Sequence, residues 1–356
     1  MNRHRALRRA LIEWYDRNRR DLPWRRTRDP YAIWISETML QQTRVETVIP
    51  YYEQFLRRFP TIQALADSDP DELMERWAGL GYYRRARNLR AAAVKIAHEH
   101  DGRLPEEVDE LRGLPGVGRY TAGAVASIAF DRPAPIVDGN VRRVFSRLFE
   151  IREDIGSAPV VARLWEEAAE LARGARPGDL NQAVMELGAV VCTPRTPRCQ
   201  ACPVARRCGA RAAGDPEALP IKKTRKAPRE VVSVAGWVAR RGRWLAARRP
   251  PVGLLGGLWE MPGGDLEAGE TPEEAIGRAL RERLGLVVKE VRPLGSVSHQ
   301  FSHRSLELHV LEAAVAEGRV RRAGYDAHRW LSRRAFGALP LSAIAQKAIG
   351  LASDPR

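Results

Sequence analysis

Long apolar runs are missing from this 356-residue sequence, since none approaches the roughly 18 residues that a membrane-spanning helix needs. The first twenty residues are too charged for the apolar part of a signal peptide. Acidic residues are in deficit, with 44 Asp and Glu against 59 Lys and Arg, and residues 222–356 carry +10 of the net +15. We therefore expect a cytoplasmic, nucleoid-associated protein with no membrane partner, and nucleic acid is the first polyanion to consider.

Cysteine is scarce, and its four occurrences lie within 17 residues, at Cys192, Cys199, Cys202 and Cys208. A disulfide framework is unusual in the cytoplasm, whereas a tight cysteine cluster is typical of a metal or iron–sulfur site. The spacing C-x6-C-x2-C-x5-C supplies four thiolates, which can hold zinc tetrahedrally or bind a [4Fe–4S] cluster. General chemistry does not separate these two.

Helical periodicity dominates the first part of the chain, and strand patterns appear only in the last part. Residues 209–230 carry glycine, three prolines and a KKTRK run, which is typical of a linker. Beyond them the pattern predicts two strands around a glycine turn, a helix over 273–284 and a strand over 305–314. We predict a multidomain protein with an all-α domain over 1–208, the linker, and an α+β domain over 231–356.

A glycine-rich turn, Leu114-Pro115-Gly116-Val117-Gly118, separates predicted helices over 108–112 and 120–130. Such a turn opens a helix whose free N–H groups can face a phosphate. We expect Gly116 and Gly118 to form a hairpin that can bind a phosphate.

Two carboxylates lie in marked settings, and such a pair can supply a general acid and an anion that stabilises a developing positive charge. Glu37 lies in WISETMLQQT, where apolar neighbours would desolvate it and raise its pKa. Asp138 lies in IVDGNV, just before a predicted helix, where it would act as an N-cap that the helix dipole keeps ionised. The alternatives are that Glu37 is an ordinary surface glutamate and that Asp138 is only a structural N-cap.

The cysteine spacing and the hairpin resemble the endonuclease III superfamily of DNA glycosylases, and ISETMLQQT with DGN resembles its MutY-type adenine glycosylase branch. The resemblance implies a helix-hairpin-helix domain, a [4Fe–4S] cluster on the four cysteines, and double-stranded DNA as the partner. Nothing in the sequence indicates an obligate dimer, so we expect a monomer. It implies removal of adenine paired with 8-oxoguanine or guanine. Glu37 would protonate adenine at N7, Asp138 would stabilise the sugar cation, and Asn140 would help to hold the site.

Tyr120 follows the hairpin at the position where bifunctional relatives carry a lysine that forms a Schiff base and cleaves the strand. A phenol cannot form that imine, so we predict a monofunctional glycosylase. A bifunctional pyrimidine-damage glycosylase is the alternative that Tyr120 disfavours. A non-catalytic iron–sulfur DNA-binding protein is disfavoured by the presence of both carboxylates.

The resemblance also assigns contacts to DNA in three regions. The wedge beside the extruded base would use Gln42, Thr43, Leu80 and Tyr82. The adenine pocket would use Trp24, Arg26 and Gln182. The loop that contacts 8-oxoguanine would use Phe301, Ser302 and His303.

Residues 264–286 resemble the Nudix box in Gly264, Glu270 and Arg278. Two of its clustered glutamates are replaced, by Ala279 and Arg283, and without them carboxylates cannot hold a Mg²⁺ pair well. We therefore expect a Nudix-like fold without hydrolysis, rather than a Nudix hydrolase fused to a DNA-binding module.

Overall fold

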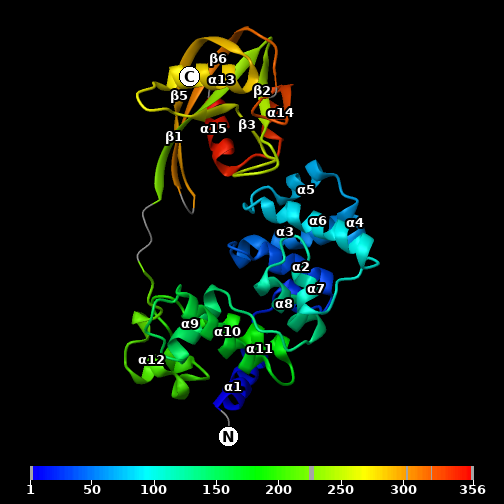
Figure 1. Ribbon diagram of the computed structural model, residues 1–356, viewed down its shortest axis with the longest axis vertical. Helices are drawn as coiled ribbons and strands as arrows, with labels where there is room; N and C mark the ends of the chain where they lie inside the picture. Colours follow the sequence, from blue (N-terminus) through cyan, green and yellow to red (C-terminus); the bar gives the residue numbers. More distant parts are fainter. Residues whose placement is uncertain (1–2, 224–227, 302–303, 322, 354–356) are drawn as a thin grey trace. The chain divides into compact units, whose positions relative to one another are not determined.

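The computed structural model describes residues 3–223, 228–301, 304–321 and 323–353 (Figure 1). The chain forms two compact units, residues 1–68 with 88–224 and residues 69–87 with 225–356. No helix in the described part of the chain is both long enough and apolar enough to cross a membrane. The predicted combination of an all-α part and an α+β part is confirmed, whereas the domain boundaries stay a prediction.

Helices account for the regular structure up to residue 218 (Figure 1). The α-helices are α1 (Arg3–Asn18), α2 (Pro30–Met39), α3 (Val45–Arg58), α4 (Ile62–Ala66), α5 (Pro70–Trp77), α6 (Arg84–Glu99), α7 (Val108–Arg112), α8 (Arg119–Phe130), α9 (Gly139–Leu148), α10 (Ala158–Ala172), α11 (Pro177–Val190) and α12 (Gly209–Ala212). Short 3-10 turns are η1 (Pro23–Arg25), η2 (Cys199–Ala201), η3 (Ala205–Arg207) and η4 (Pro216–Ala218).

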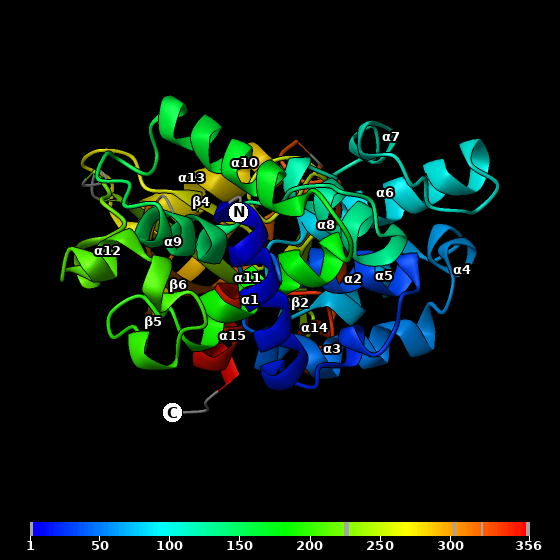
Figure 2. The same cartoon turned by 90° about the horizontal axis from the view of Figure 1, so that it is seen from below.

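Local sequence signals explain where the helices begin and which face they bury. Asp69 is the N-cap of α5 and accepts from the backbone N–H of Asp71 at 2.7 Å, with Pro70 as the first helical residue. Leu7 and Leu11, spaced one helical turn apart on α1, are buried. Their helix packs against α11, as Figures 1 and 2 both show.

The predicted linker is not extended throughout. Residues 209–218 form α12 and η4, α12 packs on α9, and Ala210 and Leu219 are buried. Apolar residues inside a stretch of linker composition drive this packing, which composition alone did not indicate.

The α+β part is a seven-stranded sheet with the order β3-β2-β1-β6-β5, to which β4 adds on β1 and β7 on β2. The pair β1–β6 is parallel and the other pairs are antiparallel. Its elements are β1 (Arg229–Arg240), β2 (Arg243–Arg248), β3 (Trp259–Glu260), β4 (Gly263–Asp265), α13 (Pro272–Leu284), β5 (Val287–Gln300), β6 (Arg304–Glu317), β7 (Ala327–Leu331), α14 (Arg333–Gly337) and α15 (Ala343–Ser353).

Helices cover this sheet through two apolar clusters. One joins α13 to β1, β2 and β6, and includes Ile276 and Leu280; the other joins α14 and α15 to the strands, and includes Trp237 and Phe336. The expected strands around Gly242, the helix over 273–284 and the strand over 305–314 are all present. Strand β5 was not expected, because its burial pattern is irregular and β-bulges interrupt its register with β6.

Candidate active site

Glu37 and Tyr120 meet in the interior of the helical part. Glu37 lies on α2 and is only 5% exposed, and Tyr120 lies on the first turn of α8. The Tyr120 hydroxyl donates to Glu37 Oε2 at 2.8 Å and also lies 3.2 Å from the sulfur of Met185. Residues 83 positions apart in the sequence therefore form one hydrogen-bonded acid pair.

Burial raises the pKa of Glu37 to about 7, in the expected direction. The hydrogen bond from Tyr120 and the charge of Arg25 oppose this rise, and the negative charge of Asp138 adds to it. Burial, with the nearby carboxylates, raises the pKa of Tyr120 well above its usual range, so that residue stays a neutral donor. A carboxyl group with a pKa near neutrality is suited to general acid catalysis at physiological pH.

Asp138 is the N-cap of α9, as predicted, and its Oδ1 accepts from the backbone N–H of Val141 at 2.7 Å. Burial raises the pKa of Asp138, while backbone N–H groups and Arg143 oppose the rise. The sequence predicted stabilisation of the ionised form by the helix terminus alone, and the structure adds the desolvation that works against it.

Asn140 lies on the first turn of α9 and faces the cysteine segment through Arg143. The Arg143 guanidinium donates to Asn140 Oδ1 at 2.8 Å and to the Cys192 carbonyl at 2.8 Å. It also donates to the carbonyl of Gly188, where a Cβ would lie 2.7 Å from that of Asn140. Asn140 is therefore placed to hold α9, which carries Asp138 at its start, against the end of α11.

Of the two expected pocket residues near η1, one is buried and the other is exposed. Trp24 is buried and packs edge-on against Tyr52 with ring centroids 5.5 Å apart. Arg26 is exposed and pairs with Asp21, so it does not line an interior pocket in this structure. Its neighbour Arg25 points inward instead, because η1 turns the chain between them.

Arg25 belongs to a buried ion triad that sequence analysis missed. Glu186 on α11 is fully buried and accepts from Arg20 and Arg25, each at 2.8 Å. Burial by itself raises the pKa of Glu186, but the hydrogen bonds from both arginines outweigh it and lower the pKa to about 2. The available signal was a glutamate flanked by apolar residues in α11. Gln182, one turn earlier, accepts from the Tyr15 hydroxyl at 3.1 Å.

The hairpin between α7 and α8 has the conformation its glycines require. Gly116 has φ +77°, and a Cβ there would lie 2.6 Å from the Cβ of Asn88. Gly118 is the N-cap of α8 and supplies no capping side chain, and a Cβ there would meet open space. The first N–H groups of α8 are thus left without a side-chain acceptor from the cap residue, as a phosphate site requires.

The predicted wedge residues fall into buried and exposed sets. Gln42 has φ +58°, and Thr43 lies beside it in the same turn. Leu80 is only 4% exposed, so its side chain packs inside the protein, whereas Tyr82 is 48% exposed with φ +47°. Tyr82 is therefore the exposed aromatic side chain of this segment.

The predicted 8-oxoguanine loop joins β5 to β6. The Phe301 N–H donates to the Arg304 carbonyl at 2.8 Å, and the ring of Phe301 packs edge-on against that of His299 at 4.5 Å. Ser302 and His303 lie outside the described residues.

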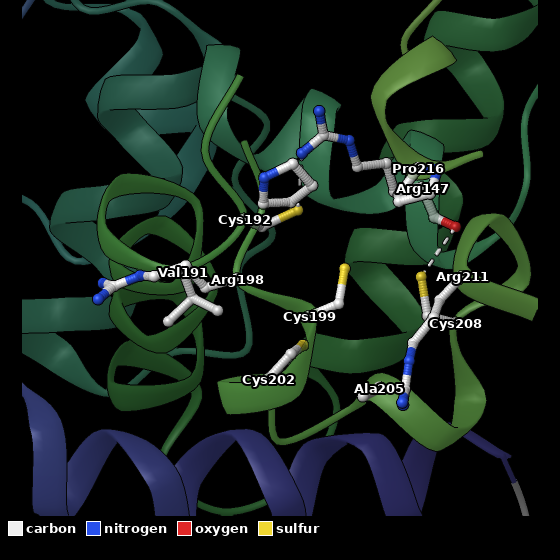
Figure 3. Close-up of a pocket in the computed structure, with 11 residues that line it drawn as sticks. Arg147, Val191, Cys192, Arg198, Cys199, Cys202, Ala205, Cys208, Arg211 and Pro216 are labelled. Atoms are coloured by element: carbon white, nitrogen blue, oxygen red, sulfur yellow. Dashed lines mark hydrogen bonds between the residues drawn. The ribbon is translucent and has the colours of Figure 1, made fainter. Parts of the chain in front are cut away.

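The four cysteines follow α11 and line one hollow together with Arg147 (Figure 3). All four are free thiols, and burial raises the pKa of Cys202 to about 11. Arg147, which is fully buried, donates to Cys192 Sγ at 3.3 Å and to the Thr193 carbonyl at 2.6 Å.

The spacing of the four thiols bears on what this hollow can hold. A tetrahedral zinc ion needs all four sulfurs about 2.3 Å from one point. Within the described ranges, no three His, Cys, Asp or Glu side chains converge closely enough for a single metal ion. Four thiols around an open space fit a larger group that needs four thiolates.

In the Nudix-like segment, one arginine pairs with both glutamates that the box retains, Glu270 and Glu282. Arg278 donates to Glu270 at 2.8 Å and pairs with Glu282 at 3.4 Å. Ala279 is buried, and the Arg283 guanidinium donates to the Gly263 carbonyl at 2.6 Å. Arg278 thus neutralises the two retained glutamates. Arg283 places a guanidinium where the box has a further glutamate.

Comparison with known proteins agrees with this construction. Residues 35–170 match the HhH-GPD superfamily of base excision DNA repair proteins, and residues 234–351 match the NUDIX domain. The structure is similar to a thermostable thymine-DNA glycosylase, with a TM-score of 0.55, 30% identity, and coverage of 59% of this chain and 97% of that one. The helices and hairpin thus define the class of helix-hairpin-helix base excision repair proteins, here with an added NUDIX domain.

Full-length similarity narrows this class. The chain is 39% identical to the human adenine DNA glycosylase, covering 96% of this chain and 73% of that one, and 38% identical to the rat enzyme, covering 99% and 78%. The chain belongs to the adenine DNA glycosylase family. The predicted resemblance is confirmed.

Proposed function

We propose that this protein hydrolyses the N-glycosidic bond of adenine paired with 8-oxoguanine or guanine in duplex DNA. It would act as a monofunctional glycosylase and as a cytoplasmic monomer. The observation that carries the proposal is the buried pair of Glu37 and Tyr120 beside Asp138, because it supplies an acid whose pKa is about 7 and a second carboxylate. Names of relatives support adenine as the base.

The carboxyls divide the chemistry between them. Protonated Glu37 donates its proton to N7 of the adenine, which makes the base a better leaving group as the glycosidic bond breaks. The Asp138 carboxylate stabilises the positive charge that develops on the sugar, and water then adds to the sugar carbon. Tyr120 holds the Glu37 carboxyl in place and cannot form an imine, so the DNA strand stays intact.

Duplex binding would use separate parts of the chain. The N–H groups at the start of α8 would bind a phosphate, and Trp24 and Gln182 would line the adenine pocket, with Arg25 in the place expected for Arg26. Phe301, Ser302 and His303 would contact the 8-oxoguanine. Substitution of Ser302 or His303 should reduce the preference for 8-oxoguanine over guanine, and an unchanged ratio would overturn that assignment.

We further propose that Cys192, Cys199, Cys202 and Cys208 bind a [4Fe–4S] cluster. Bound there, the cluster would cross-link the segment from 192 to 208 and fix it against α9 through Arg147. Its visible absorbance with four iron atoms per chain would support the proposal, whereas a colourless zinc-loaded protein would refute it.

The activity is tested with a duplex that contains one adenine opposite 8-oxoguanine, incubated with wild-type protein and with Asp138→Asn. We expect strand breaks only after alkali treatment and only with the wild type. Breaks without alkali would indicate a bifunctional enzyme, and adenine release by Asp138→Asn at the wild-type rate would overturn the site.

A further inference from the structure

The turn that carries Tyr82 is built around a buried arginine. The guanidinium of Arg85 lies 5.4 Å from the ring centroid of Trp77 and 5.4 Å from that of Tyr82. It donates to the carbonyls of Leu80 at 3.1 Å and Gly81 at 3.2 Å. One side chain therefore holds both the backbone and the aromatic ring of the turn.

The backbone of this turn is strained. Gly79 and Gly81 have φ values of +103° and +69°, which glycine adopts readily. Tyr82 has φ +47°, and a residue with a Cβ adopts this left-handed conformation only when its surroundings enforce it. The indole N–H of Trp77 donates to the Gly81 carbonyl at 3.1 Å, and the Arg85 N–H donates to the Tyr82 carbonyl at 2.8 Å.

Burial distinguishes the two stacked side chains. Arg85 is 8% exposed, and burial lowers its pKa to about 10, so it stays charged at neutral pH. Tyr82 is 48% exposed, which leaves much of its ring available to a base. A planar cation beneath the ring and donors fixed on two carbonyls can hold that ring outward before DNA binds.

We propose that Arg85 is a positioning residue that presets Tyr82 to enter the base stack when adenine is extruded. This inference rests on the proposed function. Because the ring is ordered before binding, less conformational entropy is lost when it inserts into the duplex. Arg85 acts on extrusion and not on the chemical step, which belongs to Glu37 and Asp138.

The test measures extrusion without chemistry. Proteins carrying Asp138→Asn are mixed with a duplex that holds 2-aminopurine opposite 8-oxoguanine, and the fluorescence of the unstacked base is recorded. Arg85→Met keeps a similar volume but removes the charge and all donors. It should lower the extrusion equilibrium about tenfold, the size expected for losing one stacked cation and its hydrogen bonds. The exposed neighbour in Arg84→Met is the matched control, with an expected change below about twofold.

A double-mutant cycle separates positioning from general destabilisation. Tyr82→Ala should lower extrusion, and Arg85→Met should lower it no further in the Tyr82→Ala background. Arg85→Lys retains the charge without the planar fork, so it should give an intermediate loss in a protein that folds even if Arg85→Met does not. Additive losses in the double mutant would overturn the inference. Lower thermal stability in Arg85→Lys and Arg85→Met with unchanged extrusion would overturn it too. If wild-type protein releases no adenine from its pair with 8-oxoguanine, the proposed function fails instead.

Discussion

Burial raises the pKa of Glu37, and the hydroxyl of Tyr120 opposes that rise, so removing the hydroxyl should shift the pH profile of adenine release. Tyr120 donates to Glu37 at 2.8 Å and so stabilises the ionised carboxylate. In Tyr120→Phe that stabilisation is lost, while burial and the Asp138 charge, which both raise the pKa of Glu37, remain. The pKa should therefore rise above its present value of about 7.

The magnitude follows from the strength of one such bond. A hydrogen bond to a charged acceptor contributes about 1.5 kcal/mol or somewhat more, and one pKa unit corresponds to about 1.4 kcal/mol. The expected rise is thus about one unit. Since a general acid must be protonated, the rate should fall as pH increases through the pKa, near pH 7 in the wild type. In Tyr120→Phe the fall should come about one unit higher.

The fall in rate with pH is measured as single-turnover adenine release between about pH 5.5 and pH 9, detected as alkali-induced strand breaks. Met185→Leu is the matched control, because Met185 also contacts the Tyr120 hydroxyl but does not hydrogen-bond Glu37. The pH at which the rate of this variant falls should match that of the wild type. If the rate of Tyr120→Phe falls at the same pH as that of the wild type, or at a lower pH, the assignment of Glu37 as the acid is refuted.

Three further outcomes are expected. The pKa of Glu37 is raised in the folded protein from 4.5 to about 7, so its contribution to the free energy of unfolding should be fully present below pH 4.5 and should fall by about 3 kcal/mol as pH rises through 7. Urea denaturation should show this loss in the wild type but not in Glu37→Gln. Equal losses in the two proteins would contradict the burial argument. Arg25→Ala breaks a buried ion triad and should lower the free energy of unfolding by about 3 kcal/mol, whereas Arg26→Ala should change it by less than about 0.5 kcal/mol; equal effects would show that the triad is unimportant. Gly116→Ala introduces a clash with Asn88 and should weaken duplex binding about tenfold or more in a filter-binding assay, while Gly118→Ala, with open space at its Cβ, should fold normally; wild-type affinity in the Gly116→Ala protein would contradict the hairpin geometry.

Several features of the fold could be predicted because their signals are local. Helix α5 begins where Asp69 and Pro70 indicated, and β1 and β2 flank the Gly242 turn. Strand β5 could not be predicted, because pairing along a bulged register is decided by β6 and not by the alternation of its own residues. The packing of Ala210 and Leu219 was hidden by the linker-like composition around them.

The sequence by itself determined the chemical groups: four clustered thiols, a glycine hairpin, two carboxylates, and a tyrosine directly after the hairpin. Each of these depends on residue identity and short spacing, which survive without coordinates. The tertiary structure alone decided that Arg25 and not Arg26 turns inward, that Leu80 is buried while Tyr82 is exposed, and that Arg85 lies between two rings. Burial and contact depend on segments distant in the sequence, and so does the pKa of Glu37, which burial raises and which Tyr120 on α8 and Asp138 at the start of α9 then adjust in opposite directions.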